Sequence, residues 1–173
     1  MIEAMLATIF LVSGVVAIIP LISFSLREAI DSRDQVIAGM LVQEGAELVQ
    51  NLRDNNWIQS PPKTAFDGGT FPGGDADNCR IDFNDTDIKT CDSSSKVLNL
   101  ISGNYYAHDA GAPTKFQRKI KLDFINSDTQ LIVVSVVIWG GVGASFPASI
   151  DATTCNTLSK CAFTKTTLTN WKM

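Results

Sequence analysis

The chain has 173 residues, of which 45% are hydrophobic, and a formal net charge of -4 at pH 7. This length allows one domain with a modest core, and the acidic balance argues against a general nucleic-acid-binding surface. The charge is uneven, because residues 27–56 and 57–100 each carry -3 whereas residues 101–173 carry +3. Such an asymmetry could steer packing between copies of the chain, although solvated surfaces also show it by chance.

The N-terminal segment is apolar over a membrane-spanning length. Between Glu3 and Arg27 lie 23 uncharged residues, interrupted by Gly14 and Pro20. As a helix they span about 35 Å, enough to cross a hydrocarbon layer of about 30 Å. A signal peptide would begin with basic residues, be shorter and end in a cleavage site. We therefore expect residues 1–26 to be retained, as a membrane anchor or a helix that begins as one.

The glycine and the proline in this segment predict a local weakness. Pro20 removes one backbone hydrogen bond, and Gly14 adds flexibility one and a half turns earlier. Both residues are common in membrane helices, so they can be tolerated defects. The functional interpretation is a stretch between Gly14 and Pro20 that melts when its surroundings change. Glu3, at the end of the span, can reach lipid headgroups at little cost.

Residues 27–56 continue the helix as an amphipathic segment, so a single helix is expected from about residue 2 to about residue 55. Apolar residues recur at spacings of seven and four, typical of one helix face. "DNNW" at 54–57 then supplies helix-breaking residues. The expected apolar stripe comprises Ile30, Ile37, Leu41, Leu48 and Leu52, widened by Val36, Met40 and Val49.

Residues 57–173 are expected to form a loop region and an antiparallel sheet. The strand signals are a short "RIDF" near residue 80, then 97–101, 105–108, 116–125, 130–139 and 163–171. The four residues 126–129 predict a hairpin, and the apolar run 131–138, broken only by Ser135, predicts a central strand. Lys119, Lys121 and Asp123 share the expected solvated face of 116–125. The fold class predicted is α+β, a long N-terminal helix whose apolar half protrudes and whose amphipathic half packs on the sheet.

The even number of cysteines predicts two disulfides in an oxidising compartment. Cys79, Cys91, Cys155 and Cys161 allow three connectivities. The sequence-local pairing, Cys79–Cys91 with Cys155–Cys161, closes two short loops and is the one favoured. Zinc binding is the competing interpretation, but no CxxC pair occurs and His108 is the one histidine.

No catalytic constellation or cofactor motif is found, so the chain is not expected to be an enzyme or to hold a cofactor. His108 is expected to form a surface pair with Asp109. Asp75, Asp77 and Asp82, with Asp85 and Asp87 beyond them, are candidate calcium ligands, but they lack EF-hand spacing and solvated loop is the favoured interpretation. A basic patch is formed in sequence by Lys115, Arg118, Lys119 and Lys121. The favoured interpretation is the solvated face of a strand, and DNA contact is the alternative.

The chain resembles type IV pilins and the pilin-like pseudopilins. The resemblance rests on the start "IEAMLATIFLV", on Gly14, on Pro20 seventeen residues after Glu3, and on "QEGAELVQNLRDNNW" at the end of the helix. It is strong over residues 1–57 and looser beyond, where "LIVVSVVIW", a glycine-rich loop and "LTNW" also resemble pilin-like proteins. The start departs from the family pattern, which has a basic leader ending in glycine and then usually a phenylalanine. A processed form, a truncated start or an unusual variant would each account for this.

The resemblance implies a fibre subunit and a role for its acid. Family members wait in the cytoplasmic membrane, with the globular part outside, and are processed by a prepilin peptidase that leaves a methylated amine. The assembly machinery then extracts them into a helical surface filament. The carboxylate matching Glu3 would pair there with the N-terminal amine of a neighbouring copy and act as a register check. Such fibres serve twitching motility, cell adhesion, DNA uptake or export.

Three hypotheses follow from these observations. The favoured one is a structural subunit, the major pilin of a type IV pilus. The second is a minor pilin or a type II secretion pseudopilin that starts or tips a short fibre. The third is a singly anchored surface binding module that never polymerises, and it should tolerate loss of the Glu3 carboxylate.

Overall fold

The structure is a computed structural model of the 173-residue chain, and it divides into two compact units, Met1–Val36 and Ile37–Met173. The residues that the structure describes are 2–58, 71, 76–89, 96–125, 130–140, 146, 150, 155 and 160–169.

Helix α1 (Ile2–Ile58) is continuous, as the sequence predicts, and ends three residues later than expected. "DNNW" does not break it, because Asn56 and Trp57 are buried, at 1% and 5% exposure, in contact with the core of the second unit. Propensity is a weak prior where tertiary burial opposes it. The expectation that the helix ends at these residues was wrong.

The buried face of α1 in the second unit differs in position from the predicted stripe. Leu41, Val49 and Leu52 are buried as expected, whereas Met40 is 64% exposed. Ile37 and Leu48 are partly buried. In the first unit Ile30 and Val36 are each 56% exposed, so the stripe was wrong at these positions as well. In the second unit, the other buried positions of α1 are Ala38, Val42, Gly45, Ala46 and Arg53, in addition to Asn56 and Trp57.

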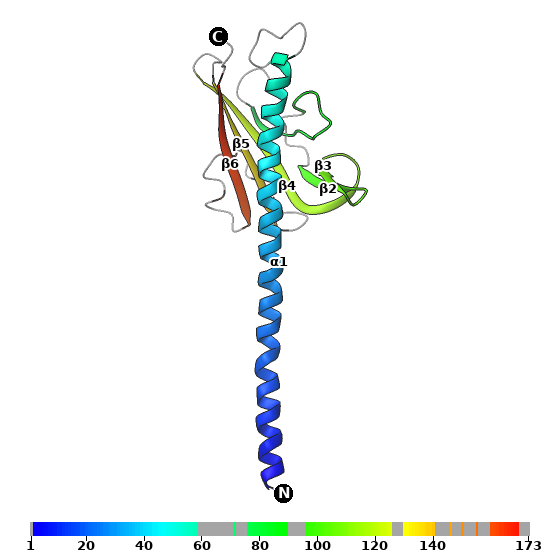
Figure 1. Ribbon diagram of the computed structural model, residues 1–173, viewed down its shortest axis with the longest axis vertical. Helices are drawn as coiled ribbons and strands as arrows, with labels where there is room; N and C mark the ends of the chain where they lie inside the picture. The colour runs from blue at the N-terminus through cyan, green and yellow to red at the C-terminus, as the bar shows by residue number, and fades with distance from the viewer. Residues whose placement is uncertain are drawn as a thin grey trace. The chain divides into compact units, whose positions relative to one another are not determined.

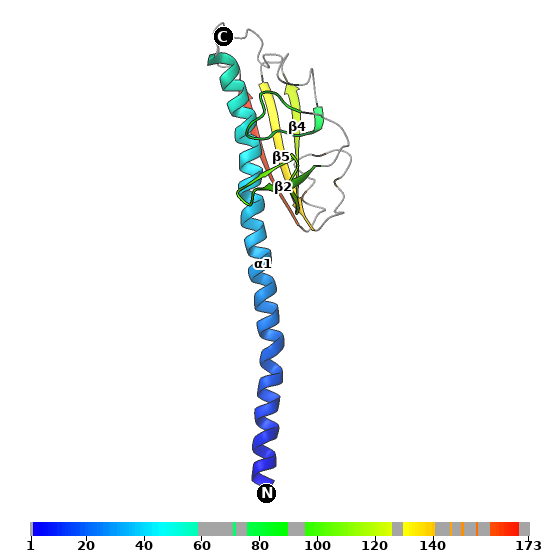
Figure 2. The same ribbon diagram turned by 90° about the vertical axis from the view of Figure 1, so that its right-hand side faces the viewer.

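The strands form one antiparallel sheet in the order β3-β2-β4-β5-β6, with β1 paired to β4. Figures 1 and 2 show the C-terminal part of α1 running along this sheet, which confirms the α+β class. One edge of β4 pairs with β5 over its length from Phe116 to Ile125, and the other edge is shared by β2 and β1. The strands are β1 (Ala76–Cys79), β2 (Val97–Ile101), β3 (Tyr105–Ala107), β4 (Ala112–Ile125), β5 (Gln130–Trp139) and β6 (Cys161–Thr169).

Most strand predictions are confirmed. The expected strands at 97–101 and 130–139 match β2 and β5 residue for residue, and β5 lies between β4 and β6 as a central strand should. The hairpin of β4 and β5 is confirmed by pairing up to Ile125 and Gln130, while its turn lies outside the described residues. The short strand expected near "RIDF" is β1, which ends directly before it, and within "RIDF" only Arg80 forms a bridge, with Lys89.

The core lies on both faces of the sheet. Toward α1, one apolar cluster joins Val49 and Leu52 to Ile120 and Val133. A second cluster on the same face, towards the other end of β5, is made by Ala38, Leu41, Val42, Leu98, Phe116, Val137 and Trp139. The opposite face of β5 packs Val134, Val136 and Ile138 against Ile150.

Candidate functional site

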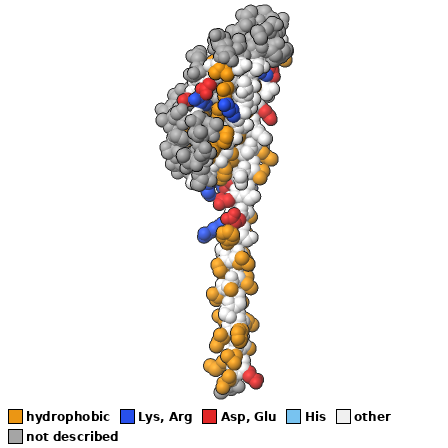
Figure 3. All heavy atoms as spheres, turned by 90° about the vertical axis from the view of Figure 1, so that its left-hand side faces the viewer, with side chains coloured by type: hydrophobic (Ala, Val, Ile, Leu, Met, Phe, Trp, Pro, Cys, Tyr) orange, Lys and Arg blue, Asp and Glu red, His pale blue; other side chains and the backbone are white. Residues whose placement is uncertain are grey.

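The first unit of the molecule presents an apolar helical surface. Its large apolar side chains from Ile2 to Leu26 are each at least half exposed, Phe10 by 74% and Phe24 by 63%. Figure 3 shows hydrophobic side chains gathered over this part of the helix, with charged side chains gathering farther along. The helix is long and apolar enough to cross a membrane by length and composition. A surface of this extent in water marks an interaction site with lipid or protein.

Three hydroxyl groups in this segment are satisfied by the helix itself. Thr8 donates a hydrogen bond to the Met5 carbonyl at 2.8 Å, and Ser13 donates to Phe10 at 2.9 Å. Ser23 donates to the Ile19 carbonyl at 3.0 Å. Hydroxyl groups paired in this way can enter an apolar medium without leaving a hydrogen-bond donor unsatisfied.

The three residues that the sequence assigns to assembly all lie in this helix. Glu3 is in the first turn, and Gly14 has no neighbour within 4 Å of the position a Cβ would take. Pro20 lies inside the helix, which is continuous through it. Proline lacks the amide that would bond to the carbonyl four residues before it, that of Val16. Melting between Gly14 and Pro20 stays a prediction.

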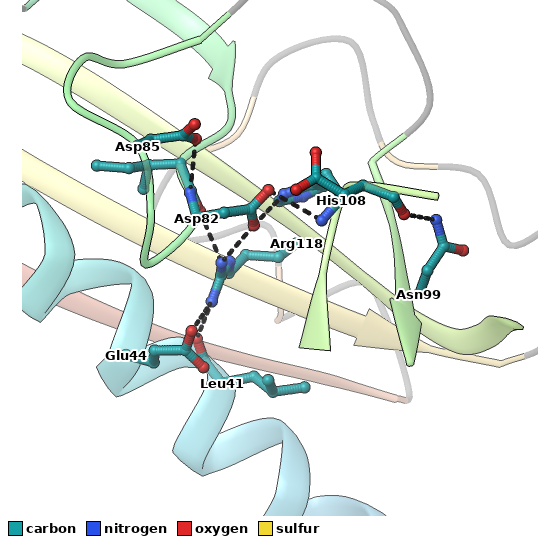
Figure 4. A network of polar contacts seen from close by, with 9 residues as sticks. Leu41, Glu44, Asp82, Asp85, Asn99, His108 and Arg118 are labelled. Atoms are coloured by element: carbon teal, nitrogen blue, oxygen red, sulfur yellow. Dashed lines mark hydrogen bonds and ion pairs between the residues drawn. The ribbon is translucent and has the colours of Figure 1, made fainter. Parts of the chain in front are cut away.

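In the second unit, Arg118 organises a buried polar network (Figure 4). Its side chain is fully buried, and its Nη2 donates to the Ile81 carbonyl at 2.7 Å. Nη1 donates to the Leu41 carbonyl of α1 at 3.3 Å and lies 3.4 Å from Glu44 Oε1. Nη2 also lies 3.4 Å from Asp82 Oδ1. One guanidinium therefore ties α1 and the loop after β1 to the middle of the sheet.

Asp82 links this network to the end of β3. Its Oδ1 lies 2.8 Å from His108 Nδ1, its Oδ2 accepts a 2.9 Å hydrogen bond from the His108 amide, and its own amide donates to Asp85 Oδ2 at 2.9 Å. Burial alone would raise the pKa of the Asp82 carboxyl. The hydrogen bonds and charge of His108, together with the Arg118 guanidinium, outweigh burial and lower that pKa below its usual value. The carboxylate form is the one that the fold holds.

The expected surface pair of His108 and Asp109 was wrong. The His108 side chain is 2% exposed and contacts Asp82, a partner 26 residues away, whereas Asp109 is exposed. The Asp109 carbonyl accepts a 2.6 Å hydrogen bond from Asn99 instead (Figure 4). The two residues are adjacent in sequence, but the His108 side chain is buried and the Asp109 side chain is exposed.

The candidate calcium ligands are not brought together among the described residues, where no group of three His, Cys, Asp or Glu side chains could hold a metal ion. Asp77 lies 3.7 Å from Lys121 Nζ, and Asp82 serves the network above. Asp87 lies 2.7 Å from Lys89 Nζ. Asp75 is outside the described residues.

The predicted basic patch is not one surface. Arg118 points to the α1 side of the sheet, whereas Lys119, the next residue, belongs to the opposite face and is only 8% exposed, with its Nζ 4.8 Å from the Phe146 ring centroid. Lys121 is partly buried beside Asp123, 3.2 Å away. The expectation of a solvated face at Lys119 was wrong, because Phe146 packs against its side chain. DNA contact stays untested.

One predicted disulfide lies within the described residues. Cys155 and Cys161 are bonded to one another, and Cys161 is the first residue of β6, paired with Ile138. Cys79 is also disulfide-bonded and fully buried. Cys91 lies outside the described residues.

A cavity of about 470 Å³ opens on the second unit beside this network. Its helix side is formed by Ile37, Met40 and Glu44, and its other side by aromatic residues of the loop after β1 and of β3. These aromatic residues are Phe83, Tyr105 and Tyr106. The cavity was not predicted, because it joins a segment of the helix to residues that lie 39 or more positions further along the chain.

Comparison with known proteins finds no matching family model, no matching curated sequence and no matching solved structure.

Proposed function

We propose that this chain is the major subunit of a type IV pilus filament and polymerises through the apolar first part of α1. The observation that carries the proposal is one continuous helix, Ile2–Ile58, with two different environments. The side chains of residues 2–30 are all exposed, and the helix from Leu41 onward buries one face against an antiparallel sheet. A subunit that must be held first by lipid and then by its neighbours needs such a division.

Before assembly the apolar segment would lie in the cytoplasmic membrane, with the globular part outside. After processing by a prepilin peptidase, the assembly machinery would transfer the segment into the centre of a filament made of copies of this chain. The three hydroxyls paired within the helix support this transfer, since neither environment has to supply their partners.

Glu3 would act as the register check of assembly. At the membrane edge its carboxylate can reach the headgroups, but in a filament core without water an unpaired carboxylate costs several kcal/mol. The N-terminal amine of a correctly docked neighbour would offset that cost. A misplaced copy would leave the acid unpaired, so the same residue would favour one register and reject others.

The test is intact-mass analysis of filaments sheared from native cells, with Glu3→Ala and a matched acid variant, Glu28→Ala. Glu28 is an exposed acid of the same helix outside the apolar stretch. We expect the unmodified chain to dominate the sheared fraction, Glu28→Ala to remain in it, and Glu3→Ala to stay in the membrane pellet. The mass would also give the first residue, any methylation and the number of disulfides.

Two results would replace this proposal. A chain that is present in sheared fibres only as a trace component is a minor pilin or pseudopilin. A chain that stays in the membrane whether or not Glu3 is present is a singly anchored binding module.

A further inference from the structure

The cavity on the second unit has the composition of a site for a positively charged organic ligand. We propose that it binds a small organic cation that carries a methylated ammonium group, such as choline. The proposal uses only residues from Ile37 onward and does not depend on whether the chain forms filaments.

Two aromatic rings form a right-angled corner of the cavity. The centroids of Phe83 and Tyr105 lie 5.0 Å apart with an interplanar angle of 80°, and the side chains are 58% and 40% exposed. Aromatic faces carry negative electrostatic potential, and sites built from several rings are the usual receptors for quaternary ammonium groups. The exposed faces are therefore available to a ligand rather than used up in the core.

A third ring is held in place from behind. Tyr106 lines the cavity and packs edge to face on the buried Phe116, with centroids 5.8 Å apart at 88°. Its position is fixed by the core cluster that Phe116 joins. The cavity thus combines one anchored ring with two exposed ones.

The charge beside the rings is negative. Glu44 is the one charged residue among the described residues that line the cavity, and its side chain is 38% exposed. Behind it, the Arg118 guanidinium lies 3.4 Å from Glu44 and 3.4 Å from Asp82, and His108 also faces Asp82, so the carboxylate left at the cavity is that of Glu44. The partly exposed Glu44 carboxylate would attract a ligand cation and repel a ligand anion.

The apolar lining selects the kind of cation. Ile37 and Met40 form the helix side of the cavity, and Met40 is 64% exposed. A compact ammonium ion would lose its water shell against these side chains without replacing it, at a high cost. A methylated ammonium presents methyl groups to them while its charge remains close to the rings. The volume of about 470 Å³ falls within the usual range for small-molecule sites.

The Asp82 network makes the site preformed. Phe83 follows Asp82 directly, and Asp82 is bound to both the backbone amide and the ring of His108, just beyond Tyr105 and Tyr106. The loop that carries Phe83 is thereby fastened to the strand that carries the other rings. A preformed site loses less ordering entropy when its ligand binds.

The experiment is an NMR titration of the full chain in maltoside micelles, which contain no choline. Methyl-¹³C methionine labels four positions in the chain, and Met40 reports on the cavity. The probes are choline chloride and its neutral isostere 3,3-dimethylbutan-1-ol, at constant ionic strength. We expect choline to give a saturating shift of the Met40 methyl signal and no shift at Met5. The alcohol should bind more weakly than choline by a factor of roughly ten or more.

Matched variants test the assignment of residues. Phe83→Leu and Tyr105→Leu keep apolar area and remove a ring, and Glu44→Gln removes the charge; each is expected to weaken choline binding roughly three- to tenfold. Phe163→Leu and Glu47→Gln make the same changes elsewhere, since Phe163 is an aromatic residue 42% exposed on β6 and Glu47 is an exposed acid of α1. These two controls should bind choline as the unchanged chain does.

The comparison of the two probes in the unchanged chain decides the proposal, so it does not depend on how any variant folds. An equal response to the alcohol would make the cavity an apolar site and overturn the proposal. The absence of any Met40 response to choline would do the same. Tighter binding of phosphocholine than of choline would overturn the free-cation assignment, because its phosphate should be repelled by Glu44.

Discussion

Among the glycines of α1, Gly45 is the one that lies directly against the sheet, where it faces Ser135 of β5. A Cβ placed on Gly45 would lie 2.6 Å from Ser135 Oγ and 3.2 Å from Arg118 Cδ. Ser135 is fully buried and lies between the two apolar clusters of this face, which contain Val133 and Val137. Ser135, the one polar residue of the apolar run 131–138, thus marks where the helix must carry no side chain.

Replacement of Gly45 by alanine should destabilise the second unit. Overpacking of this kind costs about 1–3 kcal/mol, against a gain of up to about 1 kcal/mol in helix propensity, so a net loss is expected. Urea unfolding in maltoside micelles, followed by the fluorescence of the buried Trp57 and Trp139, measures it. The double variant Gly45→Ala/Ser135→Ala should recover most of the loss, since Oγ makes the shortest contact.

Gly39→Ala is the matched control for this prediction. Nothing lies within 4 Å of a Cβ at Gly39, in the same helix. We expect this variant to gain about 0.5–1 kcal/mol from helix propensity alone. Equal effects at the two glycines would contradict the account of close approach.

Asp82 should make the stability of the second unit depend on pH in the acidic range. Because the folded state lowers the pKa of this carboxyl, its contribution is fully present above the unfolded pKa of about 3.9 and is lost as pH falls through the folded pKa. Asp82→Asn should abolish this dependence below about pH 4. At pH 7 it should cost about 2–5 kcal/mol, since a buried guanidinium is left with one partner fewer. The midpoint of urea unfolding from pH 2.5 to 7 tests both expectations.

Asp109→Asn is the control for Asp82, because Asp109 is the exposed acid next to His108 in sequence. Its stability curve should follow that of the unchanged chain at every pH. A large loss at Asp109 and none at Asp82 would mean that the sequence neighbour, not Asp82, supports His108.

The helix and the central strands were predictable because their signals are local. α1 follows from the long apolar run and the recurrence of apolar residues after it, and β5 follows from an apolar segment that only Ser135 interrupts. The end of the helix was missed because breaker propensity at Asn56 is overridden by burial at 1% exposure. Local sequence preference predicts the type of an element better than it predicts the residue at which the element ends.

The polar network could not be predicted as a set of contacts, but one of its members left a signal. Arg118 has the same parity as Ile120 and Leu122 along β4, so alternation places it on the buried face. A charge at such a position requires partners. Those partners, Asp82 and Glu44, lie 36 and 74 residues away, and they meet Arg118 only because β1 pairs with β4 and α1 packs on the sheet.

Deprotonation of Lys119 at alkaline pH should raise the stability of the second unit. Burial, together with the charge of Lys96, lowers the pKa of the Lys119 ammonium, although Asp77 opposes this change. The folded state therefore loses this proton at a lower pH than the unfolded state does. The cost of the buried charge is present below the folded pKa and is relieved as pH rises from there towards the unfolded value of about 10.4.

Lys119→Met should remove this alkaline gain, whereas Lys121→Met, at a more exposed position of the same strand, should keep it. The difference in urea midpoint between pH 7 and pH 10.5 is the quantity to compare among the three chains. An identical alkaline gain in all three would assign the effect to other groups.

The disulfide between Cys155 and Cys161 should stabilise the second unit through the start of β6. It closes a loop across a sequence separation of six, and Cys161 pairs with Ile138 at the end of the strand where β5 packs against Ile150. For a loop of this size the chain-entropy model gives about 2–3 kcal/mol. The double variant Cys155→Ser/Cys161→Ser should lose about that much free energy of unfolding, measured without reductant so that Cys79 stays bonded.

The same variant should show where the disulfide acts along β6. The rate of amide hydrogen exchange should rise first at position 161 and at Ala162, whose strand end is no longer tethered, while Leu168 at the far end of β6 stays protected. A uniform rise along β6 would mean that the bond supports the whole strand rather than its first residues.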